Sequence, residues 1–518
     1  MSQLLRPSRS LFTIALASIL AAEASAQSFQ GIGDLTGGAF SSIANSVSAD
    51  GRTVVGSSVT AAGTEAVYWR NGVLTSLGDL AGGAVDGLAS GANFDGSVIV
   101  GTGKNASAHR PLKWSGAGFS TLTQLPQVAG FSGGSTATGI SANGQTIVGW
   151  DTDNQTTAYN AVTGYRLDNG VLTGLLVPCP GSASDSGVYA TNGDGSVLVG
   201  RIRLGGFDYR GCYWVGTTLH SPPGLTGGYA YSQTLSVSYD GTVQVGTSSS
   251  AAAPNNLVGE PCRWQNDVAM SLGTVPGGSA VGAATGCNHD GSIVIGVTTV
   301  APATNGAFIW DAAHGMRALA NVLTADYGLN LTGWTLQAAY AITPDGSVIV
   351  GVGINPAGFT EGWVARLSCV TMATHCTAKT NALGCVPSIS GAGTPSATAN
   401  NGFVVKSVNM RNNKAGLLLY SANGAASTPF QGGTLCVASP VRRSTGLNSG
   451  GSPTGSDCTG VYTIDFNAFA RGLLGGTPLP ALSIPGTVVD CQFWGRDPGF
   501  AVPNNTQLSN GLRFMICN

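Results

Sequence analysis

One pattern of apolar and polar positions recurs along most of the chain. Each copy begins with a short apolar strand that ends in Asp-Gly, or in Asn143-Gly144 in the third copy, and a second apolar strand follows at once, as in residues 46–56 (SVSADGRTVVG). A further pair of apolar strands is joined by Asn71-Gly72. Asp-Gly and Asn-Gly between apolar runs are strong hairpin signals, because the favoured turn needs positive φ at its central residues. One copy, residues 46–83, therefore predicts four short antiparallel strands.

The copies keep their register. The turn glycine recurs at intervals of 45 to 55 residues, and we assign it a structural role at Gly51, Gly96, Gly144, Gly195, Gly241, Gly291 and Gly346. An aromatic residue follows each of these glycines in the third strand, at Trp69, Trp114, Tyr165, Trp214, Trp264, Trp310 and Trp363. One large aromatic at a fixed place in each copy predicts packing between neighbouring sheets rather than ligand stacking.

Seven copies of a four-stranded unit predict an all-β, seven-bladed β-propeller over residues 27–368, because a solenoid would need polar caps. Residues 31–38 (GIGDLTGG) match the end of a copy, although no copy precedes them, and the seventh copy stops after its third strand. We expect the N-terminal strand to supply the missing fourth strand and close the ring. We also expect binding on the face opposite the Asp-Gly turns, at the loops between the second and third strands, such as residues 57–65. The extra residues of these loops fall at residues 150–159 and 248–261.

The repeat stops near residue 368, and a second domain is predicted over residues 369–518. Apolar alternation there predicts strands that Gly-, Pro-, Ser- and Asn-rich turns separate, at residues 402–410, 416–421, 434–440, 460–467, 487–494 and 512–517. Such a series favours a small antiparallel β-sandwich.

The first residues predict export. Arg6 and Arg9 precede an apolar run at residues 11–22 and the small residues Ala24-Ser25-Ala26. This is the pattern of a signal peptide, residues 1–26, cleaved after Ala26. No later run approaches the roughly 18 apolar residues of a membrane span. We expect a secreted, extracellular protein without a membrane span, with the periplasm or cell surface as alternatives.

The composition and net charge limit the kinds of partner that the chain is expected to bind. Charged residues make up 9% of the chain, against about 25% in an average soluble domain. The net charge is -2 with only 23 Lys and Arg, so neither a basic nucleic-acid surface nor a polybasic membrane face is expected.

Eleven cysteines in an exported chain favour disulfides, and the odd total leaves at least one thiol unpaired or bonded to another chain. Seven of them lie in the last third, at Cys369, Cys376, Cys385, Cys436, Cys458, Cys491 and Cys517. In the repeats we predict a bridge between Cys179 and Cys212. Cys262 and Cys287 are equally compatible with a bond between blades and with two isolated buried thiols.

Candidate catalytic and metal-binding motifs are weak. Residues 130–134 match GxSxG, but no helix follows them, and a chance match is expected in a chain with 78 glycines. The five histidines lack the spacing of zinc ligands, and residues 151–154 lack the glycine and glutamate of a calcium loop. The aspartates of the repeated turns are expected to accept backbone hydrogen bonds. We therefore predict no catalytic residues, metal or cofactor.

The segments SVSADGRTVVG, AVYWRNG and SLGDLAGG resemble the bacterial extracellular HAF repeat family, and GWTLQAAYAITPDGSVIVGVG resembles its final copy. This resemblance covers about residues 29–368. It implies an exported, β-propeller-like protein and brings no catalytic residues. The tail segments TNALGCVPSISGAGTPSA, PFQGGTLCV and QFWGRDPGF are similar to a C-terminal module of other secreted bacterial repeat proteins.

Two functions are compatible with the sequence. The first is a non-catalytic, monomeric protein that binds an extracellular glycan or protein. The alternative is a glycan hydrolase or lyase, which needs two carboxylates about 5 to 10 Å apart at the mouth of the channel. Acids such as Asp79, Asp86 and Glu260 are scattered in the sequence, and none is paired.

Overall fold

The computed structural model describes residues 27–153, 162–177, 185–206, 208–253, 259–300, 304–367 and 372–517. The predicted signal peptide lies outside these ranges. Strands dominate, as the sequence predicts, and the helices are short: α1 (Leu319–Ala325), α2 (Phe466–Ala470), η1 (Ala117–Phe119) and η2 (Pro480–Ser483).

The repeats form antiparallel sheets, which we number in chain order by their strands. Sheet 1 consists of β2 (Ser42–Val47), β3 (Val54–Thr60), β4 (Gly63–Arg70) and β5 (Val73–Ser76), with β6 (Val85–Asp86) parallel to β4. Sheet 2 consists of β7 (Leu88–Ala92), β8 (Ile99–Lys104), β9 (His109–Ser115) and β10 (Thr121–Gln124). Sheet 3 consists of β11 (Ser135–Ile140), β12 (Thr146–Thr152), β13 (Val162–Asp168) and β14 (Val171–Leu175).

The next three sheets repeat this order of strands. Sheet 4 consists of β15 (Ser186–Thr191), β16 (Val197–Gly205), β17 (Asp208–Val215) and β18 (Thr218–His220). Sheet 5 consists of β19 (Ser232–Val237), β20 (Val243–Ser248), β21 (Glu260–Gln265) and β22 (Val268–Ser271). Sheet 6 consists of β23 (Gly282–Cys287), β24 (Ile293–Val300), β25 (Thr304–Asp311) and β26 (Gly315–Ala318).

Sheet 7 is assembled from both ends of the repeat region. It consists of β27 (Thr335–Ile342), β28 (Val348–Ile354), β29 (Thr360–Arg366) and the N-terminal β1 (Ser28–Gly31). β1 pairs antiparallel with β29, from Ser28 opposite Arg366 to Gly31 opposite Trp363. The first strands of consecutive sheets contact one another, and β27 contacts β2. We call the end of the sheets that carries the Asp-Gly turns the turn side, and the opposite end the loop side.

The cores of the repeat region lie between neighbouring sheets. One such core joins Val55 and Ala66 of sheet 1 to Ile99, Leu112 and Trp114 of sheet 2. Each repeat aromatic is at most 8% exposed, which confirms its predicted packing role. Burying a large side chain of this kind stabilises the fold by about 2–3 kcal/mol, so each sheet depends on its neighbours.

The C-terminal module, which we define as residues 372–517, has a single core. Its larger sheet contains β30 (Met372–His375), β33 (Ala415–Ser421), β36 (Arg442–Arg443), β37 (Leu447–Asn448), β39 (Val488–Arg496), β40 (Thr506–Leu508) and β41 (Gly511–Met515). Its smaller sheets contain β31 (Ser388–Gly393), β32 (Phe403–Met410) and β38 (Gly460–Asp465), and the hairpin of β34 (Ala425–Phe430) and β35 (Gly433–Val437).

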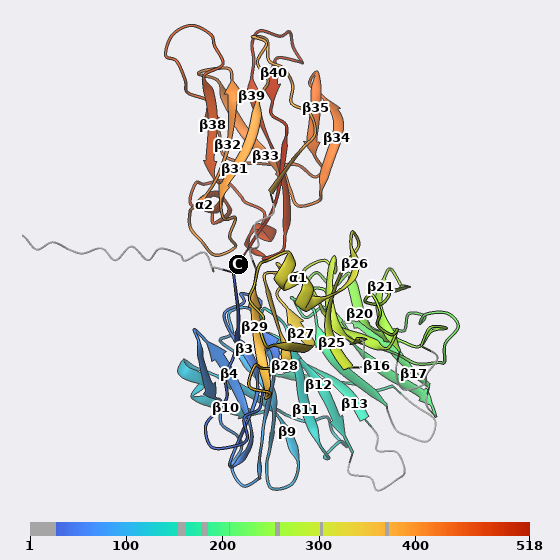
Figure 1. The fold of residues 1–518 in the computed structure, drawn as a ribbon. Helices are drawn as coiled ribbons and strands as arrows, with labels where there is room; N and C mark the ends of the chain where they lie inside the picture. Colours follow the sequence, from blue (N-terminus) through green and yellow to red (C-terminus); the bar gives the residue numbers. More distant parts are fainter. Residues whose placement is uncertain are drawn as a thin grey trace, which may run out of the picture.

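Buried residues of β31, β32 and β38 pack against those of β33, β39 and β41. All six strands that the sequence predicts in this module are found within a few residues of their expected bounds. The predicted strand at residues 460–467 is shorter, because Asp465 accepts a hydrogen bond from the Ala468 backbone and starts α2. Figure 1 shows the module (orange to red) as a second body beside the repeat sheets (blue to yellow). Over the described ranges, every helix is too short or too polar to cross a bilayer.

Candidate functional site

The turn glycines have the backbone conformation that the sequence predicts. All seven, from Gly51 to Gly346, have φ between 66° and 82°. Other L-residues adopt this left-handed region only at a cost in conformational energy. The acid or amide before each glycine accepts a hydrogen bond at 2.9 or 3.0 Å from the backbone N–H two residues later. These aspartates are therefore turn residues, as expected, and not a catalytic ring.

Each turn contains a second side-chain hydrogen-bond acceptor, which was not predicted from the sequence. The residue two positions before the acid or amide accepts a hydrogen bond at 2.9 or 3.0 Å from the backbone N–H that opens the second strand. These residues are Ser48, Asn93, Ser141, Asn192, Ser238, Asn288 and Thr343. The recurrence of a short polar residue at this position was the available signal.

Backbone hydrogen bonds also connect the turn side from sheet to sheet. The Asp50 N–H donates to the Phe94 carbonyl, and the Phe94 N–H donates to the Ala142 carbonyl, both at 2.9 Å. Similar bonds continue to sheet 7, where the His289 N–H donates to the Pro344 carbonyl at 2.8 Å. The turn side is thus a connected surface.

The first strand of every sheet contains a β-bulge at the same place. The register shifts by one residue just before the turn, and we call the seven extra residues the bulge residues. They are Asn45, Ser90, Thr138, Tyr189, Leu235, Thr285 and Tyr340. A bulge re-aims a side chain out of the regular alternation of a strand. All seven bulge residues line one cavity of about 300 Å³.

The cavity lies toward the turn side. Its wall continues from the bulge residues to residues of the turns, among them Ala49, Ala142, Tyr239 and Pro344. The sequence had favoured the loop side for binding. The expected loop at residues 57–65 is instead a tight hairpin, because β3 extends to Thr60 and β4 starts at Gly63. The loop-side expectation is therefore not supported at this segment.

The cavity wall is polar but uncharged. Among the described residues that line it there is no Asp, Glu, His, Lys or Arg. Burial raises the pKa of Tyr189 to about 12, and burial also raises the pKa of Tyr239 and Tyr340. The three phenols are therefore neutral hydrogen-bond donors and acceptors at ordinary pH. Together with Asn45 and the hydroxyls of Ser, the wall offers amide and hydroxyl groups beside aromatic faces.

The loop-side acids have structural partners within their own sheets. Glu65 accepts a hydrogen bond from Ser76 of β5, and Glu260 accepts one from Ser271 of β22 at 3.1 Å. Glu361 accepts from the Gly33 backbone N–H at 2.9 Å, directly after β1. Each acid thus fastens the third strand of its sheet to the fourth or to the residues after it.

The other acidic and histidine side chains considered as candidates from the sequence also have partners close by. Asp79 accepts the backbone N–H of Asp86 at 3.1 Å, and the Asp86 carboxylate pairs with His109 at 2.9 Å on the exposed surface. Asp151 is buried and accepts from the Val128 backbone, so it is not poised as a calcium ligand. In the described ranges, no three His, Cys, Asp or Glu residues gather where they could hold a metal ion.

The cysteines divide between the two parts of the chain. Cys212 carries a free thiol, so it does not take part in the predicted bridge with Cys179, which lies outside the described residues. The physical reason is that Cys212 points into the core between sheets 3 and 4. Cys262 and Cys287 are two separate buried thiols, which was one of the two possibilities. Burial raises the pKa of each of these thiols, so none is an activated nucleophile.

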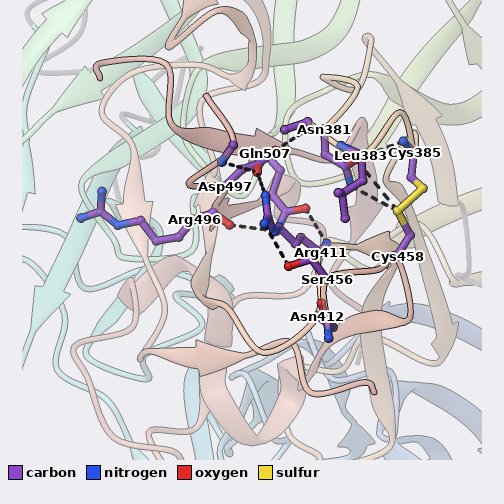
Figure 2. A network of polar contacts seen from close by, with 12 residues as sticks. Asn381, Leu383, Cys385, Arg411, Asn412, Ser456, Cys458, Arg496, Asp497 and Gln507 are labelled. Carbon is purple, nitrogen blue, oxygen red and sulfur yellow. Dashed lines mark hydrogen bonds and ion pairs between the residues drawn. A yellow bond between two sulfur atoms is a disulfide. The ribbon is translucent and has the colours of Figure 1, made fainter. Parts of the chain in front are cut away.

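The C-terminal module contains the disulfides Cys376–Cys436 and Cys385–Cys458. Figure 2 shows the second of them beside a network of polar contacts. Asp497 is fully buried and pairs with Arg411 at 2.9 Å. It also accepts the Ala382 backbone N–H at 2.7 Å, which ties the segment before Cys385 to the main sheet. The network is therefore an anchor for the disulfide-bonded loop.

Fold and site together define an all-β protein with a propeller-like arrangement of antiparallel sheets. No protein-family model matches the chain, and no curated protein matches it. Among solved structures, an oligogalacturonate lyase from Vibrio parahaemolyticus is 9% identical, with 66% of this chain and 97% of the lyase covered and a TM-score of 0.41.

Two further structures are similarly remote. The β-propeller domain of the Trilobed protease from Pyrococcus furiosus is 9% identical, with 64% of this chain and 94% of that domain covered and a TM-score of 0.40. TolB from Acinetobacter baumannii is 12% identical with a TM-score of 0.30, with 43% of this chain and 52% of TolB covered. The chain thus spans about half the length of TolB. Likenesses this low say nothing about the function of the cavity.

Proposed function

We propose that the chain is an exported, non-catalytic binding protein of the HAF repeat type. Its repeat region is a seven-bladed propeller closed by the N-terminal strand, and the central cavity binds an uncharged extracellular glycan. The observation that carries this proposal is the ring of bulge residues, one from each sheet, around a cavity without charged side chains.

Closure of the ring is supported by the position of β1. β1 occupies in sheet 7 the place that β5 and β22 occupy in sheets 1 and 5. A related contact recurs there, since Glu361 accepts a hydrogen bond from the Gly33 backbone N–H, two residues after β1. The contact of β27 with β2 joins the last sheet to the first. Closure in this way protects sheet edges that would otherwise be free to pair with other chains.

The chemistry of the cavity favours a saccharide. Neutral sugars present C–H faces that stack on tyrosine rings and hydroxyls that exchange hydrogen bonds with amides and hydroxyls. Tyr189, Tyr239 and Tyr340 supply the rings, while Asn45 and Thr138 supply polar groups. A volume of about 300 Å³ is at the lower end of small-molecule sites, which suits one or two sugar rings.

The hydrolase alternative receives no support from the described residues. A glycosidase needs a general acid and a second carboxylate across the bond that is cleaved. The lining contains neither, and Glu65, Glu260 and Glu361 are held by their own sheets. Binding of an uncharged glycan without cleavage is the function that the site supports best.

The test is a glycan array with the full chain, followed by calorimetric titration of each neutral oligosaccharide that binds. Tyr189→Ala and Tyr340→Ala should each weaken binding at least about tenfold, because each removes a stacking surface. Tyr229→Ala is the matched control, since Tyr229 is 62% exposed and does not line the cavity. Binding of only charged glycans, equal affinity of all three variants, or glycan cleavage detected by mass spectrometry would contradict the proposal.

A further inference from the structure

The C-terminal module touches the turn side at one tightly packed point. Gly486 lies against the Pro344 carbonyl and the Cβ of His289, so closely that a side chain at residue 486 would overlap both. Pro344 belongs to the turn of sheet 7 and His289 to the turn of sheet 6. The contact therefore spans two neighbouring sheets of the repeat region.

One of the contacted residues lines the cavity, and the other lies next to a residue that does. Pro344 is itself part of the cavity wall. The His289 ring lies 5.6 Å from the ring of Tyr239, which also lines the cavity. The module thus reaches the mouth of the cavity on the side of sheets 6 and 7.

The contacting segment is rigidly held within the module. The Gly486 N–H donates to the Ile516 carbonyl at 2.8 Å, and the Ile516 N–H donates to Thr487 at the same distance. Leu482 and Ile516, on either side of this point, are buried in the core of the module. Gly486 has φ 83°, a conformation that suits glycine and brings its backbone directly onto Pro344.

We propose that the turn-side rim of sheets 6 and 7 is the docking surface of the chain's own C-terminal module, and that the docked module forms a fixed side wall of the cavity mouth. A ligand then reaches the bulge residues past the turns of the other sheets. Displacement of the module widens the mouth. Docking is independent of any ligand, and only its effect on access rests on the proposed binding function.

The experiment compares two glycine variants of the full chain. Gly486→Asn and Gly472→Asn introduce the same side chain at similar positive φ, 83° and 73°. A side chain at residue 472 meets no atom within 4 Å, whereas one at residue 486 meets the turn side. Hydrogen exchange is measured on peptides that contain residues 343–347 and 480–487, and small-angle scattering gives the maximum dimension.

Gly486→Asn should speed exchange in both peptides about tenfold or more and increase the maximum dimension, because the buried contact opens. Gly472→Asn should leave both measurements at the wild-type values. Unchanged exchange in residues 417–421 and 489–493 of both variants shows that the module itself stays folded. His289→Arg provides the same test from the other side of the contact, with the exposed His314→Arg as its control.

Wild-type exchange and dimensions in Gly486→Asn and His289→Arg would overturn the docking. The same result together with normal glycan binding would leave the proposed function intact. The converse result is that the module separates in Gly486→Asn while the wild type binds no glycan. That result would support the docking and contradict the proposed function. If the docking and the proposed function are both correct, a neutral oligosaccharide should associate faster with Gly486→Asn than with the wild type.

Discussion

The repeat region and the C-terminal module are stabilised in different ways. In the repeats, sheets 1 to 6 are each built from strands that are close in sequence, only sheet 7 joins distant strands, and several small cores lie between neighbouring sheets. In the module, β30 at its start pairs with β41 near its end, so the paired strands are far apart in sequence. A single core joins all the main strands. The repeat cysteines among the described residues are free, while the module has disulfides over separations of 60 and 73 residues.

This difference predicts which interactions stabilise each part most. Local hairpins lose little chain entropy when they form, so the repeats depend on the aromatic contacts between sheets. Pairing residues that are far apart in sequence costs more chain entropy. The module therefore depends on disulfides and buried ion pairs. The two parts should therefore respond to different perturbations.

The largest effect is expected from the repeat aromatics. Trp264→Ala should lower the free energy of unfolding of the repeat region by about 3–5 kcal/mol, because it empties a fully buried site. Scanning calorimetry should show this loss in the transition of the repeats and leave that of the module in place.

A milder pair of variants refines this prediction. Trp264→Phe should cost more than Trp114→Phe, since the Trp264 Nε1–H donates to Pro223 at 2.8 Å, while the buried Trp114 Nε1 has no hydrogen-bond partner among the described residues. Equal losses would show that packing alone decides the role of these side chains.

Removal of a disulfide should affect the module instead. The double variant Cys385→Ala with Cys458→Ala should lower the free energy of unfolding of the module by about 2–4 kcal/mol, since the bond closes a long loop. Cys212→Ala is the control, because that buried thiol is free. Reductant should lower the melting temperature of wild type and of the control alike. A lower melting temperature of the repeat transition in reductant would contradict this difference between the two parts.

A smaller effect is expected at the second side-chain hydrogen-bond acceptor of the turns. Ser238→Ala should destabilise the repeats by about 1–3 kcal/mol, because the buried Val243 N–H loses its acceptor. Ser238→Asn should recover most of the loss, since Asn takes this position in sheets 2, 4 and 6. Chemical denaturation measures both, and similar losses for Ala and Asn would exclude this role.

The smallest effect is a pH dependence at the contact between the two parts. Burial lowers the pKa of His289 below its ordinary value near 6.5, although Asp240 and Asp290 oppose the shift. Below pH 6.5 the unfolded chain takes up the proton first, so stability falls as the pH decreases toward the folded pKa, by at most about 1.4 kcal/mol per pH unit. His289→Gln should flatten the melting temperature between pH 5 and 7, and an unchanged profile would show that His289 is not responsible.

Much of the fold could be predicted because its signals are local. The Asp-Gly turns, the aromatics of the third strands and six strands of the module all follow from short patterns of apolar residues and turn residues. The bulge residues could not be found in this way. Asn45, Leu235 and Tyr340 share no residue type, and only the register against the second strand shows that they occupy one position.

The strands, the turns and the buried aromatics follow from the sequence alone, because alternation and positive φ act over a few neighbouring residues. Three features are seen only in the folded chain: the cavity lies toward the turn side, its wall is uncharged, and Gly486 meets Pro344 at its rim. These features depend on strand register and on contacts between residues more than a hundred positions apart, which a local pattern does not encode.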